Sequence, residues 1–255
     1  MIQSVDRALR IIKLVSRKKE GMGVTELASI LELNKSSIFK LLSTLVSHGF
    51  IEQDSETKRY KLGYIYLELS SILLESIDLR HQAKPYLKEL EEITNEVIHL
   101  VVYDQGEVVY IEKLEGTETL RTHSKVGKRA PLHCTSVGKV ILAYLPKQKV
   151  LNILDKKDLE PHTDKTITDK DNFLQELEKV RKQGYGVEIE ENEEGISCIA
   201  APIIDNNGDI IAAVSISGPS TRMTERRLEE LQPLIKKTGD TISMRLGSLP
   251  TINND

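Results

Sequence analysis

The sequence predicts an α+β protein in two parts: a small helical domain ending in a β-hairpin, and a larger domain of mostly antiparallel strands flanked by helices. Three observations support this prediction. Helix-like and strand-like patterns follow one another within the first 63 residues, a basic segment is joined to an acidic remainder, and the apolar period changes from helical to strand-like at Val97. A chain of 255 residues is long enough for two domains.

The composition limits the class of protein. Apolar residues make up 39 % of the chain and charged residues 29 %, as in globular proteins with a real core. No signal peptide and no run of roughly 18 apolar residues is found, so we expect no membrane partner. Two cysteines, Cys134 and Cys198, are too few for a disulfide framework, which indicates a reducing cytoplasm.

The charge is unevenly distributed. Residues 1–63 contain eleven Lys or Arg against seven Asp or Glu, a net charge of +4, which leaves −8 for the rest of the chain. A basic module joined to an acidic one is typical of a nucleic-acid-binding domain attached to a domain of another kind.

The first helix is expected over residues 4–16, with Ser4 as its N-cap. Its apolar stripe would consist of Val5, Ala8, Leu9, Ile12 and Val15. A polar turn over 17–21 follows, and its three cations would lie near phosphates or simply in solvent.

Two short amphipathic helices are expected within 24–49, separated by a turn at 32–34, with Asn34 as N-cap of the second helix. Their apolar stripes are Val24, Leu27, Ala28 and Leu31, then Ile38, Leu41, Leu42 and Leu45. Polar residues occupy the other face of the second helix: Lys35, Ser36, Ser37, Lys40, Ser43, Thr44 and Ser47. Such a face suits a helix that reads the DNA major groove, although an ordinary helical hairpin with a solvated face has the same pattern.

A β-hairpin is expected after Gly49, which is well placed as a C′ glycine. The strand-like runs 50–52 and 59–62 surround a polar tip at 54–58. Three helices followed by a hairpin form a winged helix-turn-helix, here residues 1–63. Lys58 and Arg59 would form the wing, along phosphates or in the minor groove.

Residues 65–79 form a helix that is apolar over much of its circumference, so it should be buried against a partner or a core. We interpret 64–82 as a linker and dimerisation helix. Simple packing within a domain core is the alternative.

The larger domain is expected over 83–248. Pro85 would occupy N1 of its first helix, with Leu87, Leu90 and Ile93 as the stripe. Strands are expected at 97–103, 108–111, 185–190, 197–204 and 209–217, with a possible strand at 120–123. Helices are expected from Thr135 or Ser136 to 142, at 149–154, at 168–184 and at 224–246. Residues 124–129 and the acidic stretch 191–194 should be solvated loops, and 249–255 a flexible tail.

Six motifs, in order, carry a family resemblance: VDRA at 5–8, SSIFKLL at 36–42, RYKLG at 59–63, GKRAPLHCTSVGK at 127–139, GYGVEIEENEEGISCI at 184–199 and AVSISGP at 213–219. The chain resembles the IclR-type bacterial transcription regulators over essentially its whole length. The resemblance implies a winged helix-turn-helix, a linker helix and a GAF/PAS-like effector-binding domain. It also implies dimers, often tetramers, and promoter binding that a small organic acid or aromatic metabolite alters.

The resemblance also implies where the sites lie. DNA contacts are expected from Thr25, Lys35, Ser36, Ser37, Lys40, Thr44, Lys58 and Arg59. The effector pocket maps onto Ala130, Ser136, Val137, Glu188, Ile196, Cys198, Ser215 and Ser217. A helix N-terminus and two hydroxyls on one side of a strand are suitable for a carboxylate. Glu188 stands where Asp is common and Lys40 where Arg is common, which affects ligand class and operator sequence respectively.

We therefore expect a cytoplasmic regulator, associated with the nucleoid when it is bound to pseudo-palindromic double-stranded operator DNA. The first expectation is a repressor of a catabolic operon, released by a 2-keto-3-deoxy sugar acid. An activator responding to a glyoxylate-like or aromatic acid, a metal sensor using His133, Cys134 and Cys198, and a ligand-free oligomerising DNA-binding scaffold are the alternatives.

An enzyme is not expected, and neither a catalytic residue, a cofactor nor a bound metal is assigned. The chain has no G-x-S-x-G elbow, phosphate-binding glycine loop or metal-ligand spacing. His133 is next to Cys134, but adjacency alone does not make a catalytic dyad.

Overall fold

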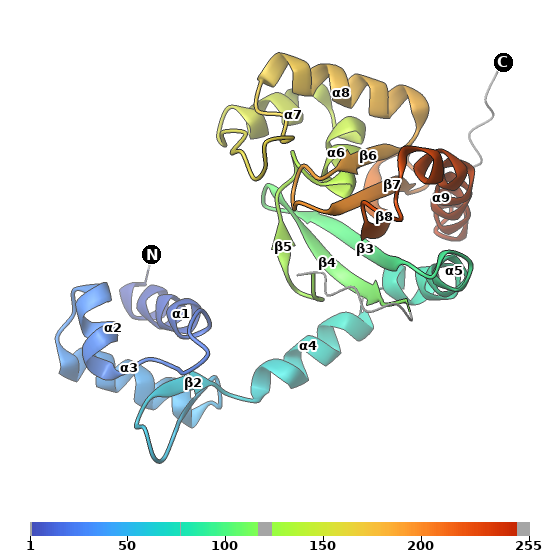
Figure 1. Ribbon diagram of the computed structural model, residues 1–255. Helices are drawn as coiled ribbons and strands as arrows, with labels where there is room; N and C mark the ends of the chain where they lie inside the picture. The colour runs from blue at the N-terminus through green and yellow to red at the C-terminus, as the bar shows by residue number, and fades with distance from the viewer. Residues whose placement is uncertain (1, 77, 117–123, 249–255) are drawn as a thin grey trace. The chain divides into compact units, whose positions relative to one another are not determined.

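The computed structural model describes residues 2–76, 78–116 and 124–248, in two compact units, 1–76 and 77–255 (Figure 1). The predicted strand at 120–123 and the predicted tail at 249–255 lie outside the described residues. Within the described residues, no helix combines the length and the apolar content that a membrane crossing requires.

The first unit consists of three helices, a hairpin and a further helix, in the predicted order. The elements are α1 Gln3–Val15, α2 Val24–Leu31, α3 Lys35–Ser47, β1 Ile51–Gln53, β2 Tyr60–Leu62 and α4 Ile65–Ser76. The strands β1 and β2 pair antiparallel, and Met22 extends the pairing by bonding to the backbone of Tyr60. The helices close over a core that includes Leu27, Ile38 and Leu42.

The prediction for α1 was wrong at its start and for two of its five stripe residues, while Ala8, Ile12 and Val15 of the stripe do pack against the core. The N-cap is Ile2, without a side-chain cap, so Ser4 lies inside the helix. Val5 and Leu9 are 53 % and 55 % exposed, whereas Ile11 and Val15 are buried. Apolar residues occupy several sides of this helix, and the face that packs is the one that the neighbouring helices cover.

The apolar helix α4 packs Ile65 and Tyr66 partly into the first unit but leaves three apolar side chains exposed there. Leu67 is 68 % exposed, and Leu69 and Ile72 are also exposed. The alternative of core packing is therefore wrong for these residues.

The helix α5, Asp78–Thr94, begins well before Pro85, so the prediction of Pro85 at N1 was wrong. A proline inside a helix leaves the carbonyl four residues earlier without its partner. That residue is His81, and both it and Pro85 are exposed to water. The buried stripe includes Ala83, Leu87 and Leu90, while Ile93 is exposed.

The second unit is built on a six-stranded antiparallel sheet in the order β5-β4-β3-β8-β7-β6, which confirms the α+β prediction. Its strands are β3 Val97–Asp104, β4 Glu107–Leu114, β5 Arg129–Ala130, β6 Gly186–Ile189, β7 Ile196–Ile204 and β8 Ile210–Pro219. The short strand β5 was predicted as loop and pairs with β4. The other helices are α6 Ser136–Tyr144, α7 Lys147–Leu154, α8 Lys170–Gln183 and α9 Glu225–Arg245.

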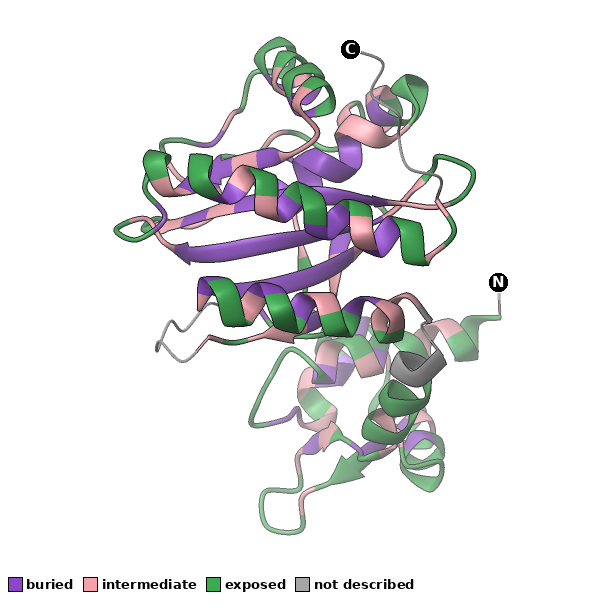
Figure 2. Ribbon diagram, turned by 90° about the vertical axis from the view of Figure 1, so that its right-hand side faces the viewer, coloured by how far each residue is buried: buried purple, intermediate pink, exposed green. Residues whose placement is uncertain are grey.

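The central strands β3, β8 and β7 are mostly buried, and Figure 2 shows long strands of the sheet in purple. One core contains Leu100 and Val214 together with side chains of α5 and α9. The other core contains Val101, which follows Leu100 on β3, and Ala213, which precedes Val214 on β8, together with side chains of α6 and α8. Successive strand residues point to opposite faces, so each strand contributes to both cores.

A β-bulge interrupts the pairing of β3 with β4 between Leu100 and Val101. His99 pairs with Lys113, and Val101 pairs with Tyr110. The bulge therefore places Tyr110 and Lys113 on one face of the sheet, although they are three positions apart and would point to opposite faces of a regular strand.

Candidate functional site

The polar face of α3 is open to solvent. Asn34 accepts a hydrogen bond from the Ser37 N–H at 2.8 Å and another from the Ser36 hydroxyl, which fixes the start of the helix. A shallow hollow on this helix is lined by Lys35, Ser36, Phe39, Lys40, Ser43 and Thr44. Phe39 is 57 % exposed and was not among the predicted DNA-binding residues. It follows Ile38 of the apolar stripe in the sequence.

The predicted wing keeps one of its two cations at the tip. Lys58 is exposed, whereas Arg59 donates to the carbonyl of Gly21 at 2.9 and 3.1 Å and to Glu26 at 3.3 Å. Asp54 accepts from Thr57 and Lys61, and these bonds hold the pKa of that carboxyl far below its usual range. The hydrogen bonds from Arg59 to Gly21 and Glu26 connect the hairpin to the helical part of the unit. Thr25, also predicted to contact DNA, is exposed in the first turn of α2.

All eight predicted effector residues line a single cavity of about 450 Å³ in the second unit. They are Ala130, Ser136, Val137, Glu188, Ile196, Cys198, Ser215 and Ser217. The volume is in the range of small-molecule sites.

The strand register explains the floor of this cavity. Glu188 pairs with Cys198, and Cys198 pairs with Ser217, so the three side chains form a row across β6, β7 and β8. Ser215 lies two residues before Ser217 and shares its face. Residues nearly 30 positions apart in the chain are thereby brought to one surface.

The N-terminus of α6 forms another wall. Thr135 is the N-cap, and its hydroxyl accepts from the Gly138 N–H at 3.1 Å. The first N–H groups of a helix, here those of Ser136 and Val137, have no carbonyl partner within the helix. They and the helix dipole favour a negatively charged group at this wall.

Glu188 is a buried carboxyl group with 2 % exposure. Its Oε1 accepts hydrogen bonds from the backbone N–H of Glu191 at 2.7 Å and of Asn192 at 3.3 Å. Burial raises the pKa of Glu188 to about 7, and the hydrogen bonds from Cys198 and these two N–H groups only partly oppose that rise. Near neutral pH this side chain can donate or accept a hydrogen bond.

His99 also lines the cavity and was not predicted. Its Nε2 is 2.8 Å from the Ser124 hydroxyl, and its Nδ1 is 3.4 Å from the hydroxyl of Ser215 and 3.3 Å from that of Ser217. Burial lowers the pKa of His99 to about 3, so the ring is neutral. Its ring meets that of Tyr110 edge-on at 4.9 Å. The sequence shows a histidine in an apolar strand but not the pairing of that strand with β8.

The prediction that the acidic loop after β6 is a solvated loop was wrong for its first residue. Glu191 is buried and forms an ion pair with the fully buried Lys139 of α6. The hydroxyls of Thr163 and Thr166 donate to the carbonyls of Glu190 and Glu191, each at 2.6 Å. The loop is therefore fixed beside the cavity by contacts from two other segments.

The candidate thiols do not form a nucleophilic site. Burial raises the pKa of Cys134 to about 12, and its sulfur contacts Asn192 Oδ1 at 3.4 Å. His133 uses Nε2 to bond the carbonyl of Glu160 at 2.9 Å. Among the described residues His133 and Cys134 group with His162, while Cys198 lies on the cavity floor instead.

Comparisons with known proteins identify relatives along nearly the whole chain. Residues 4–55 match the family model of the IclR helix-turn-helix domain, and residues 72–244 match that of the bacterial transcriptional regulator IclR C-terminal domain. The HTH-type transcriptional regulator KdgR of Escherichia coli is 36 % identical over 246 residues, which cover 96 % of this chain and 93 % of KdgR. The HTH-type transcriptional repressor AllR of Escherichia coli is 31 % identical over 96 % of this chain and 90 % of its own.

The fold is also similar to a solved structure. The crystal structure of the Thermotoga maritima IclR superposes with a TM-score of 0.78 at 35 % sequence identity. The match covers 97 % of this chain and all of that one.

Proposed function

Since this chain belongs to the IclR family of bacterial transcriptional regulators and is not an enzyme, we propose that it is a repressor that a small organic acid releases from its operator. DNA binding would be carried out by the exposed face of α3 and by Lys58. The cavity of the second unit would bind the acid. The repressing sign of regulation is supported by the similarity to AllR, an HTH-type transcriptional repressor.

The observation that carries the proposal is the chemistry of the cavity. The N-terminus of α6 and the hydroxyls of Ser215 and Ser217 can hold a carboxylate. Glu188, which is partly protonated at neutral pH, and the neutral His99 can bond keto and hydroxyl groups. A ligand with a carboxylate at one end and hydroxyls along its chain would use both the carboxylate-binding groups and the groups that bond keto and hydroxyl oxygens.

A 2-keto-3-deoxy sugar acid has this combination and is the first candidate. A two-carbon acid such as glyoxylate would leave most of the 450 Å³ unfilled. An aromatic acid is the second candidate, because the edge-on pair of His99 and Tyr110 offers an aromatic surface.

The test is fluorescence anisotropy of the full chain on a labelled fragment of its own promoter region, with and without a 2-keto-3-deoxy sugar acid. The wild-type should release the fragment as the acid is added. The double variant Ser215→Ala/Ser217→Ala should bind the fragment with unchanged affinity and fail to respond. A double variant that still responds would show that these hydroxyls do not hold the ligand.

A panel of acids in the same assay distinguishes the candidates. A thermal shift with each acid provides an independent measure of binding, because a ligand that binds the folded state raises the melting temperature. Release by benzoate-type acids alone would replace the first candidate with the second. Stabilisation by none of the acids would contradict the proposed ligand class.

A further inference from the structure

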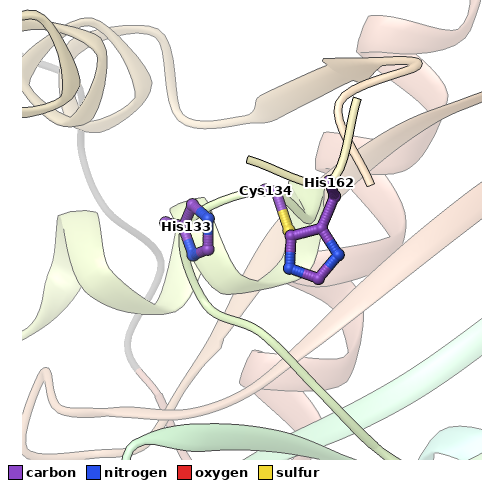
Figure 3. Close-up of side chains that lie close together, drawn as sticks. All are labelled: His133, Cys134 and His162. Atoms are coloured by element: carbon purple, nitrogen blue, oxygen red, sulfur yellow. The ribbon is translucent and has the colours of Figure 1, made fainter. Parts of the chain in front are cut away.

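A group of three metal-ligating side chains lies beside the effector cavity, and only one of them, His162, also lines that cavity. His133 and Cys134 immediately precede the start of α6, and His162 is in the segment between α7 and α8 (Figure 3). One ligand atom from each of the three lies within 4.8 Å of the others. His162 lines the effector cavity and also the adjacent hollow that His133 lines.

The hydrogen bond of His133 prepares it as a ligand. A carbonyl oxygen only accepts, so the contact of Nε2 with the carbonyl of Glu160 at 2.9 Å requires a hydrogen on Nε2. The lone pair of Nδ1 is then available for a metal. A carbonyl that fixes the second ring nitrogen of a histidine is the usual outer contact of a metal-bound imidazole. This contact is independent of the proximity of the three side chains.

The donor set selects the class of metal. Two imidazole nitrogens and one thiolate suit Zn²⁺, whereas Mg²⁺ and Ca²⁺ require oxygen ligands. Tetrahedral zinc bonds imply separations of roughly 3.3–3.6 Å between ligand atoms. A pair of ligand atoms at the 4.8 Å limit of the group therefore has to approach by roughly 1.2–1.5 Å when zinc binds. The exposed side chain of His162 can make that movement by a change of rotamer.

We propose that His133, Cys134 and His162 bind one Zn²⁺ ion per chain, with water in the fourth position. As the ion binds, the Cys134 thiol loses its proton to solvent and a zinc–thiolate bond forms. The ion would connect the segment between α7 and α8 to the start of α6. The site does not depend on the identity of the effector.

The test uses the full chain after treatment with a chelator and dialysis. Calorimetric titration with Zn²⁺ alone should give one ion per chain. Titration with Co²⁺ should give the thiolate-to-metal charge-transfer absorption and the intense visible bands of a tetrahedral site.

Four variants assign the ligands. His162→Ala should weaken zinc binding by about a hundredfold or more, since the loss of even an outer contact costs 10- to 100-fold. Cys134→Ser should abolish the charge-transfer absorption. The matched controls are Cys198→Ser, the other cysteine, and His81→Ala, an exposed histidine on α5, and both should leave the two signals unchanged.

Circular dichroism and binding to the promoter fragment show whether each variant is folded. Zinc binding and cobalt spectra that persist in folded Cys134→Ser and His162→Ala would overturn the proposal. A folded wild-type protein that takes up no zinc would overturn it as well. Neither result bears on effector binding, which the organic-acid assay measures separately.

Discussion

Glu188 is a buried carboxyl group whose protonation changes near neutral pH. Its folded pKa, about 7, is above the ordinary value of 4.5, so the folded protein retains a proton that the unfolded chain has released. The stabilisation is complete below pH 4.5 and is lost as the pH rises to 7. The loss is about 3 kcal/mol, at 1.36 kcal/mol per pKa unit.

We therefore expect Glu188→Gln to remove this pH dependence. Between pH 4.5 and 7 the free energy of unfolding of the wild-type should fall by about 3 kcal/mol relative to that of the variant. Other buried groups, such as the neutral His99, change the stability of both proteins alike. Urea denaturation followed by circular dichroism at several pH values measures both. Glu194→Gln, at an exposed position, is the control and should follow the wild-type. Parallel wild-type and Glu188→Gln profiles would contradict the assignment.

Lys40 lies on the exposed face of α3, where a side chain can reach bases or phosphates. We expect Lys40→Ala to weaken promoter binding by about tenfold and to reduce the slope of log affinity against log salt by about one, if it contacts a phosphate. Anisotropy titrations at several salt concentrations measure both values. Lys88→Ala, an exposed lysine of the second unit, is the control. An unchanged affinity and slope would remove Lys40 from the DNA-binding face.

The position of α6 depends on a close backbone contact. A Cβ atom on Gly138 would lie 2.2 Å from the carbonyl oxygen of Leu132, so a larger residue would push the helix away from the segment that precedes it. That segment includes Ala130 and Pro131 of the cavity wall. Packing between an element and its neighbour thus determines the geometry of the cavity.

Gly138→Ala should therefore destabilise the second unit by about 2 kcal/mol, within the range of overpacked sites, and weaken binding of the effector. Thermal unfolding and the organic-acid thermal shift are the measurements. Gly23→Ala is the control, because its Cβ would meet nothing within 4 Å. A Gly138→Ala variant with wild-type stability would show that the helix tolerates the displacement.

At the scale of the whole molecule, three apolar side chains of α4 lack cover within the first unit. Leu67, Leu69 and Ile72 are exposed on one short helix, and a helix of this kind is expected to pack against a partner. A second copy of the chain would cover it and would bring two recognition helices to a pseudo-palindromic operator. Half-sites would then be spaced by one DNA turn, about 34 Å, or a multiple of it.

We expect Leu67→Lys to weaken self-association and, with it, binding to the promoter fragment. Sedimentation velocity over a range of concentrations would show a shift towards monomers. Ser70→Lys adds the same charge at an exposed polar position of α4 and should have a smaller effect. Equal self-association of wild-type and Leu67→Lys would exclude the side of α4 that carries Leu67 as the dimer contact.

The sequence by itself determined most of the local elements and part of the lining of the cavity. Cap residues and apolar periods fixed most helices, because these signals act within one or two turns, as Asn34 and Thr135 show. The family motifs identified eight residues that line one cavity.

Only the tertiary structure decided which distant residues meet. His99 and Ser215 are 116 positions apart, and a strand pairing brings them together. A bulge turns Tyr110 to the cavity face, and a loop places His162 beside Cys134. Register, bulges and the choice of a helix face depend on the burial of surfaces between elements, and no local sequence pattern contains that information.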